Sequence, residues 1–338
     1  MSVVGLDIGG ANLKAADADG RAITRPFAVW KNPDRLAAEI DGLLGVFAPA
    51  DAIAVTMTAE LADCYRTKRD GVDAILRAVE LAAGGAPVLV WQTNGRFASP
   101  EEARGEPLLT AAANWHALAT FLGSLAPTGG ALLIDIGTTT CDLIPIQDGR
   151  PAAVGHTDRE RLQSGELVYT GVRRTPVCAV VGAIPFRGSE CPVMAELFAT
   201  TLDVYVTTGD LLEDPSDTDT ADGRPATITC ARDRLARCIG CDSEEFTHED
   251  ARTAADAIAA AQHRHISGAL TAVLRSHKSP PSRVFLSGIG SFLARQIVEE
   301  SRALADATLV SLLEIFGPGV AEAACAFAVA RLAVERQE

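Results

Sequence analysis

Two short acidic turns are the parts of this sequence best suited to chemistry. The first is Asp7-Ile8-Gly9-Gly10-Ala11-Asn12-Leu13-Lys14, and the second is Asp135-Ile136-Gly137-Thr138-Thr139-Thr140-Cys141-Asp142. In each, a carboxylate ends an apolar run and precedes small or hydroxyl residues, so backbone amides can approach an anion while the acid holds a bridging cation. Both turns therefore predict binding of a phosphorylated molecule together with Mg²⁺, held by Asp7 and Asp135.

The two turns belong to a repeated unit. An apolar strand delivers Asp-Ile-Gly, a second apolar strand departs, and an Asp-Gly turn follows at Asp19-Gly20 and again at Asp148-Gly149. Such a unit is a β-hairpin with its functional residues at the tip. One tip of this kind can arise for steric reasons alone, but two copies predict a duplicated fold whose tips face each other across a cleft.

The elements that position these tips are consistent with two lobes. The chain has 338 residues, and single hydrophobic cores stop growing near roughly 250–300 residues. Helical and strand patterns alternate after each hairpin, which indicates an α/β fold. We expect a first lobe over 1–129, a second over 130–318 with a substrate-binding insertion, and a last helix over 319–338 that packs back on the first lobe. Within the insertion, the patterns predict a strand over 177–184 and a helix over 193–199.

The charge balance excludes several partners. There are 44 Asp and Glu residues against 30 Lys and Arg, a formal charge of −14. Binding to nucleic acid or to an anionic membrane depends on clustered basic residues, so neither is expected. No uncharged apolar run approaches the roughly 20 residues that span a bilayer. An acid close to Met1 does not fit a secretory leader, and we expect a cytoplasmic protein.

The cysteines and histidines indicate no metal centre of their own. Eight scattered cysteines fit reduced thiols in a large protein. Cys238-Ile239-Gly240-Cys241 has the spacing of a zinc knuckle, yet no second C-x-x-C supplies the other two ligands. His263 and His265 lie two apart in a predicted helix and so face different ways.

The twin hairpins resemble the actin, sugar kinase and Hsp70-like ATPase superfamily over nearly the whole chain. The resemblance implies a two-lobed actin-like ATPase fold, built by duplication of a ribonuclease H-like unit around a central cleft. It implies phosphate binding in three turns, which comprise Gly9, Gly10, Asn12 and Lys14, then Gly137, Thr138, Thr139, Thr140 and Asp142, and finally Ser287, Gly288 and Gly290. Many kinases of the group have Thr or Ser where Ala11 stands, so ATP binding is open.

A narrower likeness involves segments of both lobes. The segments 60–72, 112–119, 169–176, 195–211, 220–225 and 234–237 look like the hydantoinase/oxoprolinase-related proteins of the tetrahydromethanopterin-linked one-carbon pathway. Archaeal members of that group build methanofuran by joining the phenol of γ-glutamyl-tyramine to an aminomethylfuran-methyl diphosphate, with release of diphosphate. The resemblance therefore implies a transferase of methanofuran or methylofuran synthesis, with a tyramine or tyrosine-type acceptor.

This chemistry needs a base and anion-binding groups. A phenol has a pKa near 10 in water and must lose its proton to attack at neutral pH. Glu60 follows the predicted strand 52–57 and is the candidate base, although a glutamate that merely begins a helix fits the same pattern. Asp7 and Asp135 complete the predicted catalytic set. Residues predicted to bind substrate are Lys68, Arg69, Arg173 and Arg174, each with a surface role as the alternative. The prediction also includes Asp222 and Arg224, which could instead only close a turn, and Asn114, which could instead be the polar neighbour of a core aromatic.

Two other functions stay open from the sequence. An ATP-dependent small-molecule kinase or a hydantoinase-type hydrolase would use Lys14 and the Ser287-Gly288 turn, and a non-catalytic switch protein would use the same cleft. The oligomeric state is also open, with a homo-oligomer as one alternative.

Overall fold

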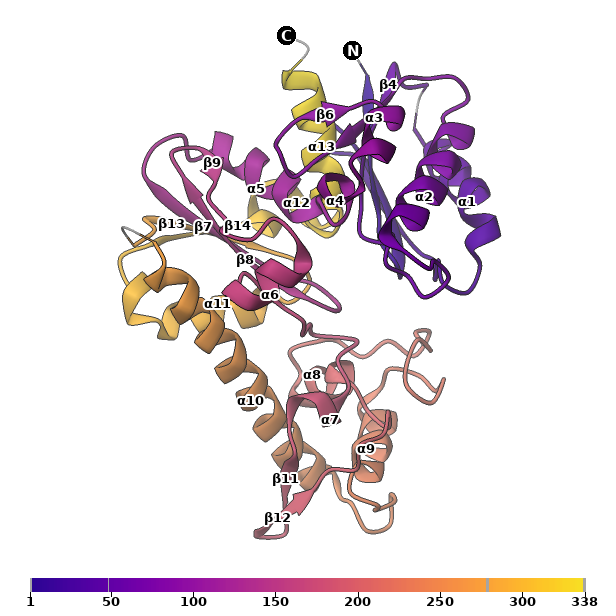
Figure 1. Cartoon of the computed structure of the whole chain (residues 1–338). Coiled ribbons are helices and arrows are strands. Elements are labelled where there is room, and N and C mark those ends of the chain that lie inside the picture. The colour runs from indigo at the N-terminus through magenta and orange to yellow at the C-terminus, as the bar shows by residue number, and fades with distance from the viewer. Residues whose placement is uncertain (1, 48, 278–279, 337–338) are drawn as a thin grey trace.

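A computed structural model describes residues 2–47, 49–277 and 280–336, and Figure 1 shows its arrangement. Within these residues, the first lobe is a six-stranded sheet in the order β3-β2-β1-β4-β5-β6, with helices packed on it. β1 and β2 are antiparallel, while β1 and β4 are parallel. The strands are β1 (Val3–Ile8), β2 (Asn12–Asp17), β3 (Ala22–Pro26), β4 (Ala52–Met57), β5 (Val88–Trp91) and β6 (Phe97–Ala98).

The second lobe repeats this core. Its sheet has the order β10-β8-β7-β13-β14, and β9 pairs with β8. β7 and β8 are antiparallel, and β7 and β13 are parallel, as in the first lobe. The strands are β7 (Gly130–Ile136), β8 (Cys141–Gln147), β9 (Arg150–Pro151), β10 (Leu167–Val168), β13 (Arg283–Ser287) and β14 (Thr308–Ser311).

Register makes the duplication explicit. Asp7 lies opposite Lys14 across the first hairpin, and Asp135 lies opposite Asp142 across the second. The apolar residues of β1 are fully buried, as are most residues of β7 and β8, because helices cover these central strands. The acidic turns thus lie at the ends of deeply buried strands, and the predicted hairpins are confirmed.

Helices cover both sheets. The first lobe has η1 (Pro33–Arg35), α1 (Leu36–Leu44), α2 (Lys68–Ala82), α3 (Pro100–Gly105), α4 (Pro107–Thr110) and α5 (Asn114–Ser124). The rest of the chain has α6 (Asp158–Ser164), α7 (Val177–Val180), α8 (Thr201–Thr208), α9 (Ile228–Arg237), α10 (His248–Arg275), α11 (Ser291–Glu300), η2 (Arg302–Leu304), α12 (Leu312–Glu322) and α13 (Ala324–Glu335). The residue limits predicted for the lobes remain a prediction.

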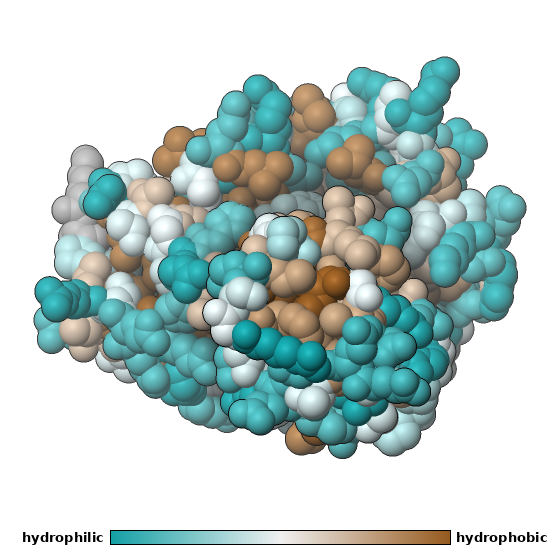
Figure 2. All heavy atoms as spheres, turned by 90° about the horizontal axis from the view of Figure 1, so that it is seen from below, coloured by the Kyte–Doolittle hydropathy of each residue, from teal (hydrophilic) through white to brown (hydrophobic). Residues whose placement is uncertain are grey.

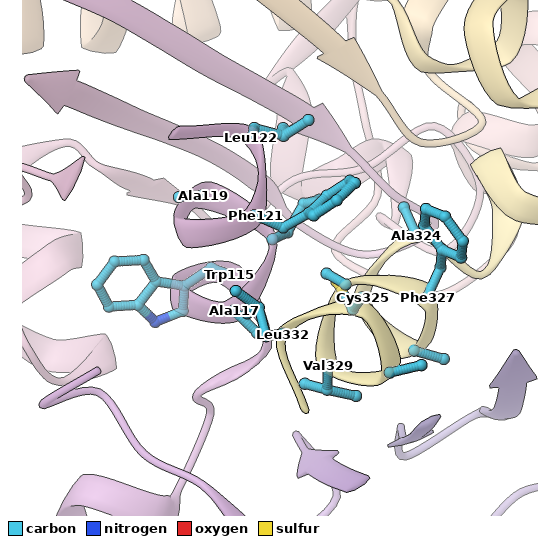
Figure 3. Close-up of a cluster of buried hydrophobic side chains, with 14 of the residues drawn as sticks. Trp115, Ala117, Ala119, Phe121, Leu122, Ala324, Cys325, Phe327, Val329 and Leu332 are labelled. Carbon is cyan, nitrogen blue, oxygen red and sulfur yellow. The ribbon is translucent and has the colours of Figure 1, made fainter. Parts of the chain in front are cut away.

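The helix α13 lies against β1 and α5, and Figure 3 shows the apolar side chains that α5 and α13 bury together. Phe121 and Phe327 meet edge to face with ring centroids 5.5 Å apart. Gly5 allows the helix to approach the strand, because a Cβ built there would lie 1.9 Å from the carbonyl oxygen of Ala326. The N-terminal end of α13 therefore lies beside the strand that carries Asp7.

The insertion between β10 and α10 projects from the second lobe (Figure 1). Its hairpin β11 (Ala183–Phe186) and β12 (Ser189–Pro192) contacts α10, and α8 packs between α9 and α10. The strand predicted over 177–184 is wrong in its first half, which is the helix α7, and the helix predicted over 193–199 is absent from the described structure. Hydrogen bonds of Val193 to Gly182 and of Met194 to Cys238 hold that segment in an irregular path instead.

The free end of this insertion is partly apolar. Viewed from below, apolar surface lies in the middle of the molecule with hydrophilic surface around it (Figure 2). Met194 and Leu197, both in the insertion, are about half exposed.

Ion pairs stabilise the interior of the insertion. The fully buried Arg234 pairs with Asp203 at 2.7 Å and with Asp222 at 2.9 Å.

Among the described residues, no single helix has both the length and the hydrophobicity required to cross a membrane. The helices α12 and α13 satisfy that test only when taken together, and they meet at a bend of 97°.

Candidate functional site

A cleft between the two sheets contains both acidic turns. Its volume is about 590 Å³, in the range of small-molecule sites. The first lobe lines it with Asp7, Gly9, Gly10, Ala11, Asn12, Lys14, Trp30, Thr58, Glu60 and Asn114, and the second lobe with Asp135, Gly137, Thr138, Thr139, Thr140, Asp142, Arg161, Arg174, Ser287 and Gly288. Glu322 and Cys325 reach it from α12 and α13.

The two turns are built alike. The amide of Gly9 donates to the carbonyl of Asn12 at 3.0 Å, and the amide of Gly137 donates to the carbonyl of Thr140 at 2.8 Å. Within the described residues, the amides at the tips, Gly10 and Thr138, have no backbone acceptor. Each turn thus offers free N–H groups to an anion in the cleft, as phosphate-binding loops do.

The first acid, Asp7, is only 5% exposed, and its Oδ1 has no hydrogen-bond partner among the described residues. Burial raises the pKa of Asp7, and Lys14 opposes that rise. Burial would lower the pKa of Lys14, yet Asp7, Cys325, Asp135 and Glu322 raise it above its usual value. Lys14 therefore lies close to the acids of both turns, which places Asp7 and Asp135 near each other.

The second acid, Asp135, also has a pKa above its usual value. Burial and the neighbouring Asp142 raise its pKa to about 6, and Lys14 opposes them. An unpaired carboxylate oxygen on Asp7 beside Asp135 fits a hard cation, since Mg²⁺ is commonly held by one or two carboxylates plus substrate phosphates. In the described ranges, no three His, Cys, Asp or Glu side chains lie close enough together to hold a metal ion. A cation between Asp7 and Asp135 would therefore need oxygen ligands from the bound phosphate as well.

The third turn closes the cleft behind Asp135. Gly288 has φ +81°, and a Cβ there would lie 2.2 Å from the carbonyl oxygen of Ile136. The hydroxyl of Ser287 is buried without a hydrogen-bond partner among the described residues. Gly290 does not line the cleft, and a Cβ there would lie 2.5 Å from Cγ2 of Ile136. Its lack of a side chain thus serves packing between the third turn and β7.

Glu60 lies in the cleft where the sequence predicted a base. The segment after β4 is fixed by hydrogen bonds from Thr58 and Ala59 to the carbonyl of Ile8. Glu60 is 1% exposed, and its Oε2 has no partner within the described residues. Burial raises its pKa to about 7 and Asp158 adds to the rise, while backbone amides and Lys68 oppose it. A carboxyl with this pKa can accept a proton at neutral pH.

Arg161 is a cleft residue that the sequence did not indicate. It is 1% exposed, ion-paired with Asp142, and its guanidinium lies 4.3 Å from the ring centroid of Trp115. Its Nε has no partner in the described part of the chain. The signal available in the sequence was the capping box Thr157-x-x-Glu160, which marks the start of α6 but says nothing of which face meets the cleft.

Two more cleft residues lie face to face from opposite lobes. Trp30 lies in the segment after β3, and Arg174 lies in the segment after β10. The guanidinium carbon of Arg174 lies 5.0 Å from the centroid of the indole ring. Arg174 was predicted as a substrate ligand, whereas Trp30 was missed. Asn114, also predicted, lines the cleft from the start of α5.

The other predicted substrate ligands do not line the cleft. Arg173 pairs with Asp217 at 2.6 Å, and Arg69 donates to the backbone of Arg104. Asp222 and Arg224 pair with each other and with neighbouring insertion residues. Lys68 forms an ion pair of 3.2 Å with Asp158 of the other lobe, beside the cleft. Its charge there lowers the pKa of Glu60 and so opposes the effect of burial.

Comparisons with known proteins agree with this construction. The profile of the hydantoinase/oxoprolinase family matches residues 51–336. A protein of Methanocaldococcus jannaschii is 33% identical over 335 residues, which cover 98% of this chain and 97% of the relative. A protein of Methanococcus vannielii is 28% identical over 203 residues, 60% of this chain and 89% of that protein. Both are named (4-{4-[2-(gamma-L-glutamylamino)ethyl]phenoxymethyl}furan-2-yl)methanamine synthase.

Solved structures extend the likeness of the fold. Nucleotide-free acetone carboxylase has a TM-score of 0.52 and 12% identity, covering 98% of this chain and 70% of its own. The duplicated hairpins and the cleft confirm the predicted two-lobed, actin-like α/β fold. By its profile match over 51–336 and a relative one-third identical along nearly its full length, the protein belongs to the hydantoinase/oxoprolinase family.

Proposed function

We propose that this protein is a transferase of methanofuran or methylofuran synthesis, which forms an aryl alkyl ether and releases diphosphate. The full-length relationship to a named phenoxymethyl-furan methanamine synthase carries this proposal. The cleft supports it, because two amide-lined turns and two acids suit a diphosphate with its cation. The substrates would be an aminomethylfuran-methyl diphosphate and the phenol of a γ-glutamyl-tyramine or tyrosine-type acceptor.

The reaction breaks one bond and forms another at the same carbon. The C–O bond between the furan-methyl carbon and diphosphate breaks, and its electron pair leaves with the diphosphate. The phenol oxygen then forms a C–O bond to that carbon, and its proton passes to a base. No oxidation or reduction takes place, and no ATP is consumed.

Residues of the two turns would hold the leaving group. The amides of Gly10 and Thr138 and the ammonium of Lys14 would bind diphosphate oxygens, and Asp7 and Asp135 would hold Mg²⁺. The bound cation would neutralise charge on the departing diphosphate. Arg161 keeps Asp142 neutralised, and Arg174, which has no ion pair among the described residues, is available to the anion.

Glu60 would take the phenol proton. Its pKa of about 7 and its unpartnered Oε2 in the cleft meet the requirements of a general base at neutral pH. About half of the Glu60 carboxyls would be ionised at neutral pH, so activity would rise with pH near 7.

The purified full chain tests the function directly. Incubation with the furan-methyl diphosphate, the phenolic acceptor and Mg²⁺ should give the ether by mass spectrometry and one diphosphate per ether. Asp135→Asn should stop both, while Asp19→Asn, an exposed acid of the first hairpin, should not. Failure of the unchanged protein to form ether over a range of pH and Mg²⁺ would refute the proposal.

An ATP-dependent kinase or hydrolase is the second candidate, favoured by Lys14 beside two acids in an actin-like cleft. Ala11 argues against it, because the first turn lacks the hydroxyl common in kinases. Release of ADP from ATP and Mg²⁺ without a furan donor would favour this candidate. A cytoplasmic location and a homo-oligomeric state remain predictions.

A further inference from the structure

Trp30 is held over the first turn by the backbone that precedes it. The amides of Phe27 and Val29 donate to the carbonyls of Ala11 and Gly10, each at 2.9 Å. A hydrogen bond of 3.0 Å from Lys31 to Ala28 closes a turn that presents Trp30 to the cleft. The indole is thus fixed relative to the amides that would bind diphosphate.

Arg174 is held over the second turn in the same manner. Its amide and that of Arg173 donate to the carbonyl of Thr138, at 2.9 and 3.2 Å. Gly171 permits this approach, because a Cβ there would lie 2.4 Å from the amide nitrogen of Thr139. The two residues therefore meet above both turns, each carried by a segment that is bonded to its own turn.

The contact between them is easily exchanged. Within the described residues, the Arg174 guanidinium makes no hydrogen bond or ion pair, whereas that of the adjacent Arg173 is bound to Asp217 at 2.6 Å. A guanidinium held only by an aromatic face is bound weakly, and a charge-assisted hydrogen bond to a phosphate is stronger. A diphosphate in the turns would therefore draw Arg174 from the ring and leave the indole face open.

We propose that Trp30 is a catalytic residue that stacks against the furan ring and stabilises the positive charge formed as diphosphate leaves. The proposal rests on the proposed function. Its basis is that the indole already holds a planar, delocalised cation at 5.0 Å, in the cleft that both turns line and on segments hydrogen-bonded to those turns. The furan-methyl cation is also planar and delocalised, and it would lie where the guanidinium lies now.

Two variants and one labelling experiment test the role of the aromatic face. Trp30→Phe should lower kcat about threefold and Trp30→Leu at least about tenfold, since a cation–π contact of 1–2 kcal/mol changes a rate by that order. Replacing all tryptophans with fluorinated analogues should lower kcat progressively in the unchanged sequence. The same replacement in Trp30→Phe should lower kcat much less, because Trp91 and Trp115 are buried in the core and only Trp115 contacts a cleft residue, the guanidinium of Arg161.

A binding measurement separates this role from simple anion binding. Inorganic diphosphate should change the tryptophan fluorescence of the unchanged protein but not that of Trp30→Phe. Trp30→Leu should bind inorganic diphosphate at least as tightly, because Arg174 no longer has to leave a ring. Tenfold weaker binding by Trp30→Leu, or a kcat unchanged by that substitution, would overturn the proposal.

Failure of the role proposed for Trp30 can be distinguished from failure of the proposed function. If the unchanged protein forms no ether, the proposed function is refuted and the role of Trp30 with it. If the unchanged protein forms ether and Trp30→Leu forms it at the same kcat, only the role of Trp30 is refuted.

Discussion

The two hairpins share a backbone but differ in charge. Asp7 and Asp135 occupy the same place in each, yet the facing residue is Lys14 in the first lobe and Asp142 in the second. In the first lobe the ammonium of Lys14 lies near several acids and has no ion pair among the described residues. In the second lobe Asp142 is paired with the buried Arg161. The two hairpins thus share the acid proposed to hold Mg²⁺, and only the first places a lysine opposite that acid.

The difference assigns distinct tasks to equivalent positions. Lys14 can contact an anion in the cleft, because the structure records no ion pair for it within the described residues. Asp142 cannot bind a cation without giving up Arg161, and its burial raises its pKa while Arg161 opposes that rise. We therefore expect Asp142 to stabilise the fold and Lys14 to bind the substrate anion, and four measurements test this difference between the lobes.

The largest effect should come from the shared acids. Asp7→Asn and Asp135→Asn should each lower kcat/KM about 10³–10⁴-fold, because each would remove a proposed ligand of the Mg²⁺ that neutralises the leaving group. Initial rates measured against Mg²⁺ concentration will show it, with Asp19→Asn as the control. If either variant stays within tenfold of the unchanged protein, the acids do not act as a pair.

Breaking the buried pair of the second lobe should affect stability instead. Arg161→Met should lower the free energy of unfolding by about 3–5 kcal/mol, because Asp142 then remains charged without a partner. Denaturant titration should show that much of the loss returns in the double variant Arg161→Met/Asp142→Asn. A double variant as unstable as the single one would mean that Arg161 acts through Trp115 rather than through Asp142.

Glu60→Gln should lower kcat about 100-fold and change its pH dependence. Activity of the unchanged protein should rise as pH increases through about 7, where Glu60 ionises, and this rise should be absent in the variant.

The raised pKa of Glu60 affects the free energy of unfolding in the opposite direction. A folded-state pKa of about 7 against 4.5 when unfolded means that stability falls as pH rises from about 4.5 to 7, by an order of 3 kcal/mol. Melting temperatures of Glu60→Gln should show less of this decline.

The smallest effect should be on binding of the anion. Lys14→Met should weaken binding of inorganic diphosphate about tenfold, the order expected for one charge-assisted hydrogen bond. Asp142→Asn should leave that affinity unchanged in calorimetry. Equal losses in the two variants would contradict the division of tasks between the lobes.

The sequence was sufficient where local pattern decides structure. The hairpins at Asp7 and Asp135 were predictable because apolar strands bounded by glycine turns occur twice, and Glu60 because it follows a strand that ends at the same edge. The irregular segment 193–199 was not, since its path depends on hydrogen bonds to residues outside it, Gly182 before the hairpin β11–β12 and Cys238 at the end of α9.

The same reason explains the site residues that were missed. Trp30 and Arg161 reach the cleft through tertiary contacts, which no spacing in the sequence records. Conversely, Asp222 and Arg224 stand in a conspicuous acidic stretch but pair within the insertion. Charge pattern alone could not tell a ligand from a partner.

The contact of α13 with Gly5 also has a consequence for how the protein is made. Residues 324–335 complete the core beneath the strand that carries Asp7, although some 320 positions separate them. A nascent polypeptide therefore has to expose that part of the core until residues 324–335 have left the ribosome. Emergence of α13, rather than of the first third of the chain, sets the moment when the first aspartate acquires its final surroundings.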